Sequence, residues 1–384
     1  SFQTARAAFC LNALVGSYGA RGGLLFPPVP GLGSFTPPAT PPVTSKRADG
    51  AGDGLYPLAQ PEEGLAQLLP EIILSEEPYP IAALVVNHAN PARSLPNTTK
   101  VEKALAKLEL LVVIDVQMSE TAQMAHYVLP ESTYLERLDP LIVSTRLVSE
   151  VALRQPVVKP LYDTKPATEI IIGLAQALGL SRFLEFAVEE TIQAQLKTIG
   201  LTLEALKKSG VWQGKTEPTQ GPPRFTIPSG KVELYSEALM AKGLEPLPVY
   251  EPPRTMPDIH AFRLLTGHEA MHTGTATQGN PYMAALGKEN TLWIHPARAA
   301  RLGIENGNWV IVTSPTGQVR VRARLTEGIH PEAVFLAHGY GRDSKLRPFA
   351  FGQGGNDSAL IADQAEPLVG GAALGETIVT VRRG

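Results

Sequence analysis

Cysteine is nearly absent from this sequence: its 384 residues include only Cys10. An iron–sulfur cluster needs about four thiolates, and a structural zinc site needs several Cys or His residues in close register. The sequence therefore predicts no iron–sulfur cluster on this chain. Cys10 lies on the apolar side of a helical pattern with Phe9, Leu11 and Leu14, which favours a buried small hydrophobe. A single cysteine leaves the redox compartment undetermined.

An excess of positive charge is also lacking. The formal net charge is −3 and the sequence pI is about 6.3, whereas proteins that bind nucleic acids usually carry a basic balance. We therefore expect no nucleic-acid partner. No apolar run reaches the length of a membrane span, and the best candidate, Ile170 to Leu180, is short and interrupted by Gln176. Since 43% of the residues are hydrophobic and 18% charged, the chain can bury a sizeable core, and its length suggests two to three domains.

The first residues, SFQTARAAFCLNALVGSYGARGG, lack an initiator Met and the basic region and cleavage site of a signal peptide. Their pattern is typical of a sequence that begins inside a helix. We therefore expect a cleaved or truncated piece of a longer chain, although a processed subunit would have the same features.

The first half of the sequence has an α/β pattern. Apolar runs at 81–86 and 110–114 flank a short helix at 101–108, which predicts a parallel sheet covered on both faces. Further helices are expected at 4–16, 166–178 and over most of 183–208, and a Pro-rich connector at 27–42. The predicted division is a helix and connector (1–50), an α/β domain (51–212), a linker (213–257) and a β-rich domain (258–384).

The last part changes to β periodicity. Residues 309–313 and 318–325 flank a turn at 314–317, and apolar and polar residues alternate along the second run. This pattern predicts a hairpin with one buried face, preceded by a short helix at 296–302. We expect the region to form a β-barrel.

Asp115 ends the second predicted strand, at the edge of the sheet where open α/β folds bind ligands. There its carboxylate could accept hydrogen bonds from the N1–H and N2–H₂ edge of a guanine. Capping of the following helix is an equally good interpretation of this position. Ser119 and Thr121 follow at a loop–helix junction, where hydroxyl groups suit contact with phosphate or ribose.

The loop 87–94 leaves the neighbouring strand at the same edge. Asn90-Pro91 starts a turn, and Arg93 and Ser94 could meet a pyrophosphate. One such loop is a weak signal. Two loops from neighbouring strand ends favour a dinucleotide site.

Three blocks in this order resemble the dimethyl sulfoxide reductase family of molybdenum and tungsten enzymes. The first is VVNHANPARSLP followed by VIDVQMSETAQMAHYVLPESTYLER, and the second is FTIPSGKVELYSEAL. The third is LLTGHEAMHTGTATQGNP followed by IHPARAARLGIENGNWVIVTSPTGQVRVRARL. Together they cover most of the chain, and their joint order is more specific than any one of them.

The resemblance implies an α/β fold with a partial parallel-sheet dinucleotide-binding domain, followed by a six-stranded barrel of the double-psi type. It implies bis-molybdopterin guanine dinucleotide with molybdenum or tungsten, shared with an N-terminal half. The residues expected to hold the guanosine diphosphate arm are Asn87, Asn90, Ser94, Asp115, Ser119 and Thr121. Those expected to line the pterins are His268, Glu269, His272, Thr273, Thr277 and Asn356. At His268 the sequence departs from the arginine that the family commonly has.

Histidine offers few metal ligands. His272 could be a ligand or a proton donor, but without partner ligands nearby a hydrogen bond to cofactor or backbone is the favoured interpretation. His88, His126, His295 and His338 show no clustered HxxxH spacing, so we predict no metal site on this chain. In the family, the protein ligand of the metal and the Cys-rich iron–sulfur motif lie in the N-terminal half, and we nominate no catalytic residue.

Within the family, HGYGRDSKLRPFAFGQGGNDSALIADQAEPLVGG and VALRQPVVKPLYDTKPATEII most resemble the polysulfide and thiosulfate reductase branch. The resemblance implies reduction of polysulfide, thiosulfate or tetrathionate. It further implies an N-terminal half or partner subunit, an iron–sulfur electron-transfer subunit, a membrane anchor subunit and a periplasmic or membrane-associated location. An arsenate or other oxyanion reductase and a catalytically silent structural subunit of a respiratory complex are the alternatives.

Overall fold

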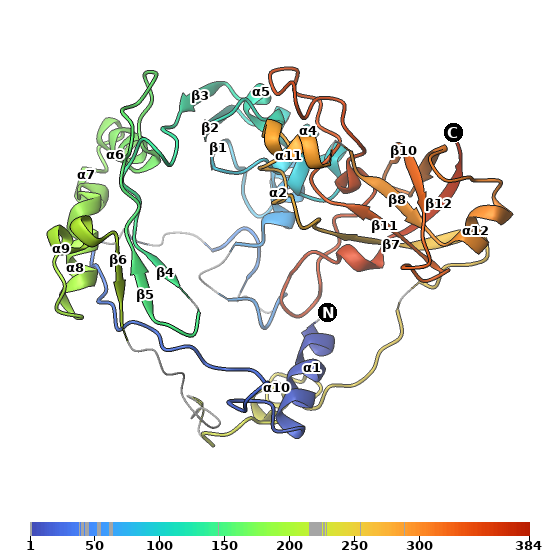
Figure 1. Cartoon of the computed structure of the whole chain (residues 1–384), viewed down its shortest axis with the longest axis horizontal. Helices are drawn as coiled ribbons and strands as arrows, with labels where there is room; N and C mark the ends of the chain where they lie inside the picture. The colour runs from blue at the N-terminus through green and yellow to red at the C-terminus, as the bar shows by residue number, and fades with distance from the viewer. Residues whose placement is uncertain are drawn as a thin grey trace. The chain divides into compact units, whose positions relative to one another are not determined.

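The computed structural model describes residues 2–37, 39, 42, 46–51, 55–60, 64–144, 146–214, 225, 227, 229–253, 255–287 and 289–384. Its contacts divide the chain into two compact units, whose elements are labelled in Figure 1. One unit comprises Lys46–Leu129 and Glu251–Gly384. The other comprises Phe2–Ser45 and Pro130–Tyr250.

The α/β segment of the first unit is built on two parallel strands, β1 (Ala83–Asn87) and β2 (Leu110–Asp115), with β3 (Tyr127–Pro130) next to β2. Helix α4 (Thr98–Lys107) connects β1 to β2, and the side chain of Asn97 caps it by accepting a hydrogen bond from the backbone N–H of Lys100. Its apolar stripe packs on the sheet together with α2 (Leu69–Ser75), which follows a short 3-10 helix, η1 (Ala66–Leu68). The predicted strand–helix–strand unit is confirmed.

The expectation that this sheet is covered on both faces is wrong for β1. Strand β2 is buried from Leu111 to Ile114, but Val85 of β1 is 53% exposed. The reason is that α2 and α4 cover the face that carries Val86, whereas Ala83 and Val85 point to the other face.

The rest of the first unit is a closed six-stranded barrel with the order β10-β8-β11-β7-β12-β9, as predicted. Its strands are β7 (Ala261–Gly267), β8 (Thr291–Ile294), β9 (Trp309–Thr313), β10 (Gln318–Leu325), β11 (Ala333–Ala337) and β12 (Ile378–Arg383). The pairs β7–β11 and β8–β10 are parallel, and β9–β10 is the predicted hairpin. Inward side chains such as Leu264, Val321 and Leu336 form one core. Short helices α11 (Pro281–Leu286), α12 (Pro296–Arg301), η2 (Asp357–Ala359) and η3 (Leu374–Glu376) lie between strands.

The second unit contains a three-stranded antiparallel sheet, β4 (Ile142–Ser144), β5 (Glu150–Ala152) and β6 (Val211–Gln213). Its helices are α1 (Phe2–Leu14), α6 (Ala167–Ala177), α7 (Ser181–Leu184), α8 (Val188–Lys197), α9 (Leu203–Ser209) and α10 (Glu237–Met240). Val151 of β5 packs against α8 and α9 in a core of its own. The helices predicted over 4–16, 166–178 and most of 183–208 are therefore confirmed, whereas the three short strands were not foreseen.

Cys10 is half-buried, so the expectation of a buried residue is wrong. Helix α1 has no buried residue, and Phe9 and Leu11 on it are 60% and 62% exposed. Arg6 ties α1 to the backbone of Leu234 and Pro246. This places residues of the predicted linker in the same compact unit as α1, while the part of the linker at 215–224 lies outside the described residues.

The two compact units do not coincide with the four ranges predicted from the sequence. The reason is that residues after Leu129 pack with the N-terminal segment, while the barrel packs with 46–129. The contacts group residues by compactness and do not test domain boundaries, so the four-part division stays a prediction. None of the described helices is long and apolar enough to cross a membrane.

Candidate functional site

The ends of β1 and β2 lie at one edge of the sheet, because the strands run parallel and Asn87 is in register with Ile114. Asn87 is exposed and Asp115 is half-buried. Oδ1 of Asp115 accepts a hydrogen bond of 3.1 Å from the backbone N–H of Gln117, and no described residue donates to Oδ2. Helix α5 (Glu120–Met124) is capped by Ser119, whose Oγ accepts from the N–H of Ala122. Asp115 therefore does not cap this helix, and the guanine contact stays a prediction.

A buried network joins the two strand-end loops. Asn90 precedes the four-residue helix α3 (Pro91–Ser94), and its side chain does not cap that helix. Instead its Nδ2 donates to Oε2 of Glu120 at 2.8 Å. Oδ1 of Asn90 accepts from both the N–H and the hydroxyl of Thr121, and Oγ1 of Thr121 accepts from the N–H of Ala92. The Ser94 hydroxyl donates to the Asn90 carbonyl. Asn90 and Thr121 thus use their polar atoms to fix the loops, rather than to present them to a ligand.

Glu120 carries this network across to the barrel. Its Oε1 accepts from the backbone N–H groups of Asp343 and Ser344, and its Oε2 lies 3.0 Å from Nη2 of Arg342. Burial opposes ionisation of Glu120, but the Arg342 charge and the hydrogen bond from Asn90 hold its pKa below the ordinary value. Glu120 is therefore an ionised carboxylate buried between the two parts of this unit.

His272 is buried in the barrel loop that precedes α11, and both of its ring nitrogens have protein partners. Nε2 lies 3.1 Å from the Gly287 carbonyl, which only accepts, so Nε2 carries the proton. Nδ1 lies 3.1 Å from Oγ1 of Thr277, which also accepts from the N–H of Thr273 and can donate its own proton to Nδ1. His272 therefore positions this loop by backbone contact, as favoured above, and it is not available as a metal ligand in this arrangement.

A second histidine, His338, follows β11 and bonds through Nδ1 to the buried carboxylate of Asp357. That hydrogen bond raises the pKa of His338. The exposed ring of His268, which follows the paired strand β7, lies edge-on to the ring of His338. Nearby, the Tyr340 hydroxyl donates to Glu269 at 2.7 Å. Glu269 and His268 are thus joined to the 338–340 segment at one end of the barrel.

Asn356 faces the α/β segment: its Nδ2 donates to Oγ1 of Thr98 at 2.9 Å. The glycines before it are required by close packing. A Cβ on Gly354 would lie 2.3 Å from Oδ1 of Asn290, and one on Gly341 would lie 2.2 Å from the backbone nitrogen of Asn356. Asn356 and its glycines therefore pack the loop against the protein itself.

The structure thus separates the twelve predicted site residues into two kinds. Six are engaged in internal hydrogen bonds through their side chains and build the loops: Asn90, Ser119, Thr121, His272, Thr277 and Asn356. Ser94 and Glu269 also bond within the protein, at exposed or half-buried positions. Asn87, Asp115, His268 and Thr273 keep polar side-chain atoms that no described residue binds. Contact of any of the twelve with a cofactor stays a prediction.

Sequence reasoning missed the buried charged and polar residues between the two loop sets, namely Glu120, Arg342, Ser344 and Arg347. They stand in SETAQ and GRDSKLRP, where charged residues beside glycine and proline are typical of an exposed loop. The available signal was the position of Arg342 and Arg347 on either side of Asp343, within a Gly-rich loop.

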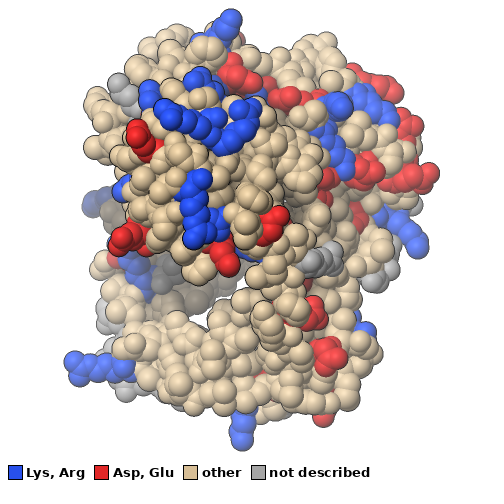
Figure 2. Space-filling model, turned by 90° about the vertical axis from the view of Figure 1, so that its right-hand side faces the viewer, with Lys and Arg blue, Asp and Glu red and all other residues tan. Residues whose placement is uncertain are grey.

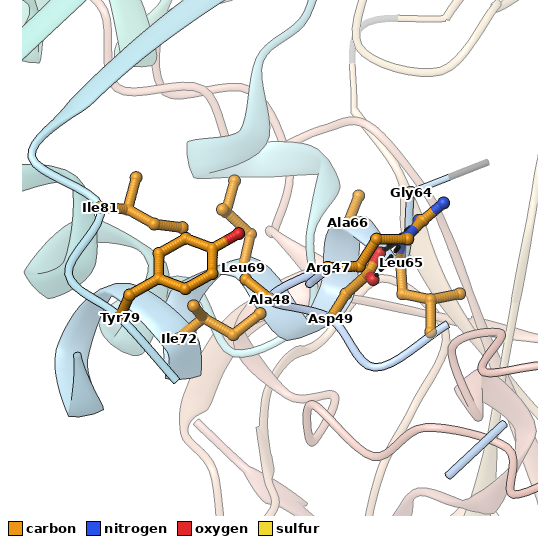
Figure 3. Close-up of a pocket in the computed structure, with 10 residues that line it drawn as sticks. All are labelled: Arg47, Ala48, Asp49, Gly64, Leu65, Ala66, Leu69, Ile72, Tyr79 and Ile81. Carbon is orange, nitrogen blue, oxygen red and sulfur yellow. Dashed lines mark hydrogen bonds and ion pairs between the residues drawn. The ribbon is translucent and has the colours of Figure 1, made fainter. Parts of the chain in front are cut away.

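A hollow of about 370 Å³ lies elsewhere in the same unit, beside α2 (Figure 3). Leu65, Leu69 and Ile72 line it, and Arg47 and Asp49 pair at its rim. It contains none of the predicted cofactor residues. On the face shown in Figure 2, basic and acidic side chains are interspersed, without one extended field of a single sign. Among the described residues, no group of three or more His, Cys, Asp or Glu could hold a metal ion.

Two ranges of the chain match families of known proteins. Residues 46–177 match the family described as Molybdopterin oxidoreductase, and residues 262–378 match the Molydopterin dinucleotide binding domain. The molybdopterin-containing subunit of thiosulfate reductase from Salmonella typhimurium is 28% identical over 95% of this chain and 53% of its own length. The menaquinone reductase molybdopterin-binding-like subunit of Nitratidesulfovibrio vulgaris is 29% identical over 75% of this chain and 40% of its own.

Among solved structures, acetylene hydratase from Pelobacter acetylenicus superposes with a TM-score of 0.71 at 23% identity, over 87% of this chain and 50% of that one. This likeness shows the fold. The chain spans about half or less of the length of these relatives.

A molybdopterin dinucleotide suits the chemistry of the site. An anionic dinucleotide needs hydrogen-bond acceptors for its base and positive charge for its phosphates, and the strand edge offers Asp115 and the buried guanidinium groups of Arg342 and Arg347. Two parts of the chain match the two domain descriptions in the predicted order, and the fold agrees with both. The chain belongs to the molybdopterin oxidoreductase family.

Proposed function

We propose that this chain is the cofactor-holding part of a bis-molybdopterin guanine dinucleotide oxidoreductase that reduces an inorganic sulfur compound, such as thiosulfate, polysulfide or tetrathionate. The observation that carries the proposal is 28% identity to a thiosulfate reductase subunit over 95% of the chain. The protein ligand of the molybdenum or tungsten and the iron–sulfur cysteines would come from a part of the enzyme outside these 384 residues.

The residues of this chain would bind and orient the cofactor. Asp115 would accept from the guanine edge, with Asn87 beside it, and the Asn90–Thr121–Glu120 network would hold both strand-end loops in place. On the barrel side, His272 and Thr277 would fix the loop against the pterins. When bound, the cofactor supplies two-electron chemistry at its metal, while the protein contributes position and electrostatics.

A catalytically silent structural subunit is the second candidate. The relative named as a molybdopterin-binding-like subunit, 29% identical over 75% of this chain, supports it. This candidate allows the cofactor contacts to be lost without harm to the assembly. Under either candidate, the names of the relatives as subunits support assembly with other chains. An iron–sulfur subunit and a membrane anchor at the periplasmic side are part of the proposal.

The test is to purify the whole native protein that contains this chain and to measure molybdenum, tungsten, pterin and guanine nucleotide per molecule. We expect one metal and two guanine nucleotides. Reduction of thiosulfate, polysulfide and tetrathionate by a reduced viologen then identifies the substrate, with arsenate and nitrate as oxyanion controls. A native assembly without metal or pterin would overturn the enzymatic proposal in favour of the silent subunit. Activity on an oxyanion alone would overturn the sulfur substrate only.

A further inference from the structure

Three arginines lie close to the strand edge, and they differ in how they are neutralised. Arg93 is paired with Glu102 and Asp343 at 2.7 and 2.5 Å. Arg342 lies 3.0 Å from Glu120, although none of its guanidinium nitrogens makes a hydrogen bond with a described residue. Arg347 is only 6% exposed and has neither an ion pair nor a side-chain hydrogen bond among the described residues. No described residue therefore neutralises the positive charge of Arg347 by direct contact.

The surroundings of Arg347 place it at the site. A Cβ built on Gly279 would lie 3.0 Å from Nη2 of Arg347 and 3.3 Å from Oε1 of Gln117, so the guanidinium lies beside the chain that leaves β2. Gly279 belongs to the barrel loop before α11. Arg347 therefore lies where the loop after Asp115 meets the predicted pterin-side loop, and a side chain at 279 would crowd its guanidinium.

The electrostatics around Arg347 favour a bound anion. Burial lowers the pKa of Arg347, and the nearby charges of Glu120 and Asp115 oppose that effect without contacting the guanidinium. Burial likewise lowers the pKa of Arg342 to about 10. A buried cation without a contact anion is unfavourable, so a bound anion that contacts the guanidinium would offset this cost.

The geometry points to Arg347 as the residue that binds a phosphate oxygen of the dinucleotide's diphosphate, while Asp115 on the same edge faces the guanine. A diphosphate suits this position, because the planar guanidinium can donate two parallel hydrogen bonds to phosphate oxygens. Gln117 and Gly279 flank the guanidinium and add no competing charge. This inference rests on the proposed function, since it assigns one contact within that cofactor site.

The assignment predicts opposite effects with and without ligand. In the cofactor-free protein, Arg347→Gln removes an unpaired buried charge, so the melting temperature should stay the same or rise. In the loaded protein, the same substitution should weaken retention of the dinucleotide. A merely structural role for Arg347 predicts a lower melting temperature in both states.

The experiment uses the whole native protein containing this chain, as wild type, Arg347→Gln, Arg347→Lys, Asp115→Asn and the control Arg320→Gln. Arg320 is exposed and stacks on Trp309 outside the site. Acid-released GMP is measured on each purified protein. Binding of GDP, GMP and guanosine to the cofactor-stripped protein is measured by calorimetry. For Arg347→Gln we expect GDP affinity about 10- to 100-fold weaker with guanosine affinity unchanged, as for loss of a charged hydrogen-bond donor. Arg347→Lys should recover part of the loss.

Asp115→Asn should instead weaken all three ligands together, and Arg320→Gln should weaken none. Unchanged GDP affinity in Arg347→Gln, or equal losses for GDP and guanosine, would overturn the assignment of Arg347. The proposed function would still stand in that case, provided that the wild-type protein releases GMP. A wild-type protein that contains no GMP would overturn the proposed function, and this assignment with it.

Discussion

The α/β segment meets the barrel at two places that are built differently. At the strand edge, the contact is a buried charge network centred on Glu120, with Arg342 and Ser344 from the barrel loop. At the start of α4, the contact uses backbone and polar groups: the N–H of Asn97 donates to the carbonyls of Ser358 and Ile361, and Lys100 pairs with Asp363. Only the first contact concentrates buried positive charge beside the predicted site. Both contacts join the two parts, and the contrast agrees with the proposal that the strand-edge contact also meets an anionic ligand.

The largest effect is expected from Glu120→Gln, which leaves Arg342 as a buried charge without a counter-ion. Breaking a buried ion pair by removing one partner costs about 3–5 kcal/mol, and we expect the free energy of unfolding to fall by that amount. Urea denaturation of the purified protein measures it. The double variant Glu120→Gln/Arg342→Met should recover most of the loss, because it removes the stranded charge. A double variant that is less stable than Glu120→Gln alone would contradict this account of the strand-edge contact.

Thr121→Val tests the neutral part of the same contact. It removes the hydroxyl donor to Asn90 and leaves the buried N–H of Ala92 without its acceptor. The expected loss is about 1–3 kcal/mol in the free energy of unfolding, the cost of an unsatisfied buried polar group. The matched control is Thr273→Val, because Thr273 is exposed and uses only its backbone N–H. Equal losses in the two variants would show that the Asn90 network does not stabilise the loops.

The framework of both contacts could be predicted from the sequence, because periodicity reports which faces are buried. Residues 110–114 and the alternation along 318–325 correspond closely to β2 and β10. The strands β4, β5 and β6 have three residues each, too few for a period to show. Helix α2 was not predicted, because its seven residues span only two turns and show little helical periodicity.

The structure shows which hydrogen bonds the predicted site residues make within the protein, and several of these partners were not predicted from the sequence. Asn90 and Thr121 belong to a pattern that resemblance assigns to the cofactor, yet their polar atoms bond to each other. No sequence pattern indicated that Arg347 is buried. Its guanidinium lies beside Gln117, which is 230 residues earlier in the chain (347 − 117), and only the folded structure brings the two loops together. Side-chain partners across the two segments are a tertiary property, which local sequence does not encode.

His338 links the barrel to the second contact, because its partner Asp357 begins η2, the 3-10 helix that receives the backbone bond from Asn97. The hydrogen bond raises the folded-state pKa of His338 above its ordinary value of 6.5. The resulting stabilisation is therefore fully present below about pH 6.5 and is lost as pH rises through the folded pKa. We expect His338→Gln to cost about 1 kcal/mol at pH 5.5 and less at pH 9, measured by urea denaturation at both values. A cost that grows with pH would contradict the assigned pair.

The smallest effect is expected from Lys100→Met at the second contact. Lys100 pairs with Asp363 and, at 2.5 Å, with Glu71, but all three side chains are partly exposed, and Glu71 is 60% exposed. Solvent-exposed ion pairs contribute about 0–1 kcal/mol, and methionine keeps the apolar stem of the lysine, so the free energy of unfolding should change by no more than that. The change should also shrink as salt is added, whereas the loss from Glu120→Gln should persist, because buried charges are poorly screened. A salt-insensitive loss of several kcal/mol in Lys100→Met would erase the distinction between the two contacts, and with it the argument that charge is concentrated at the strand edge to meet a ligand.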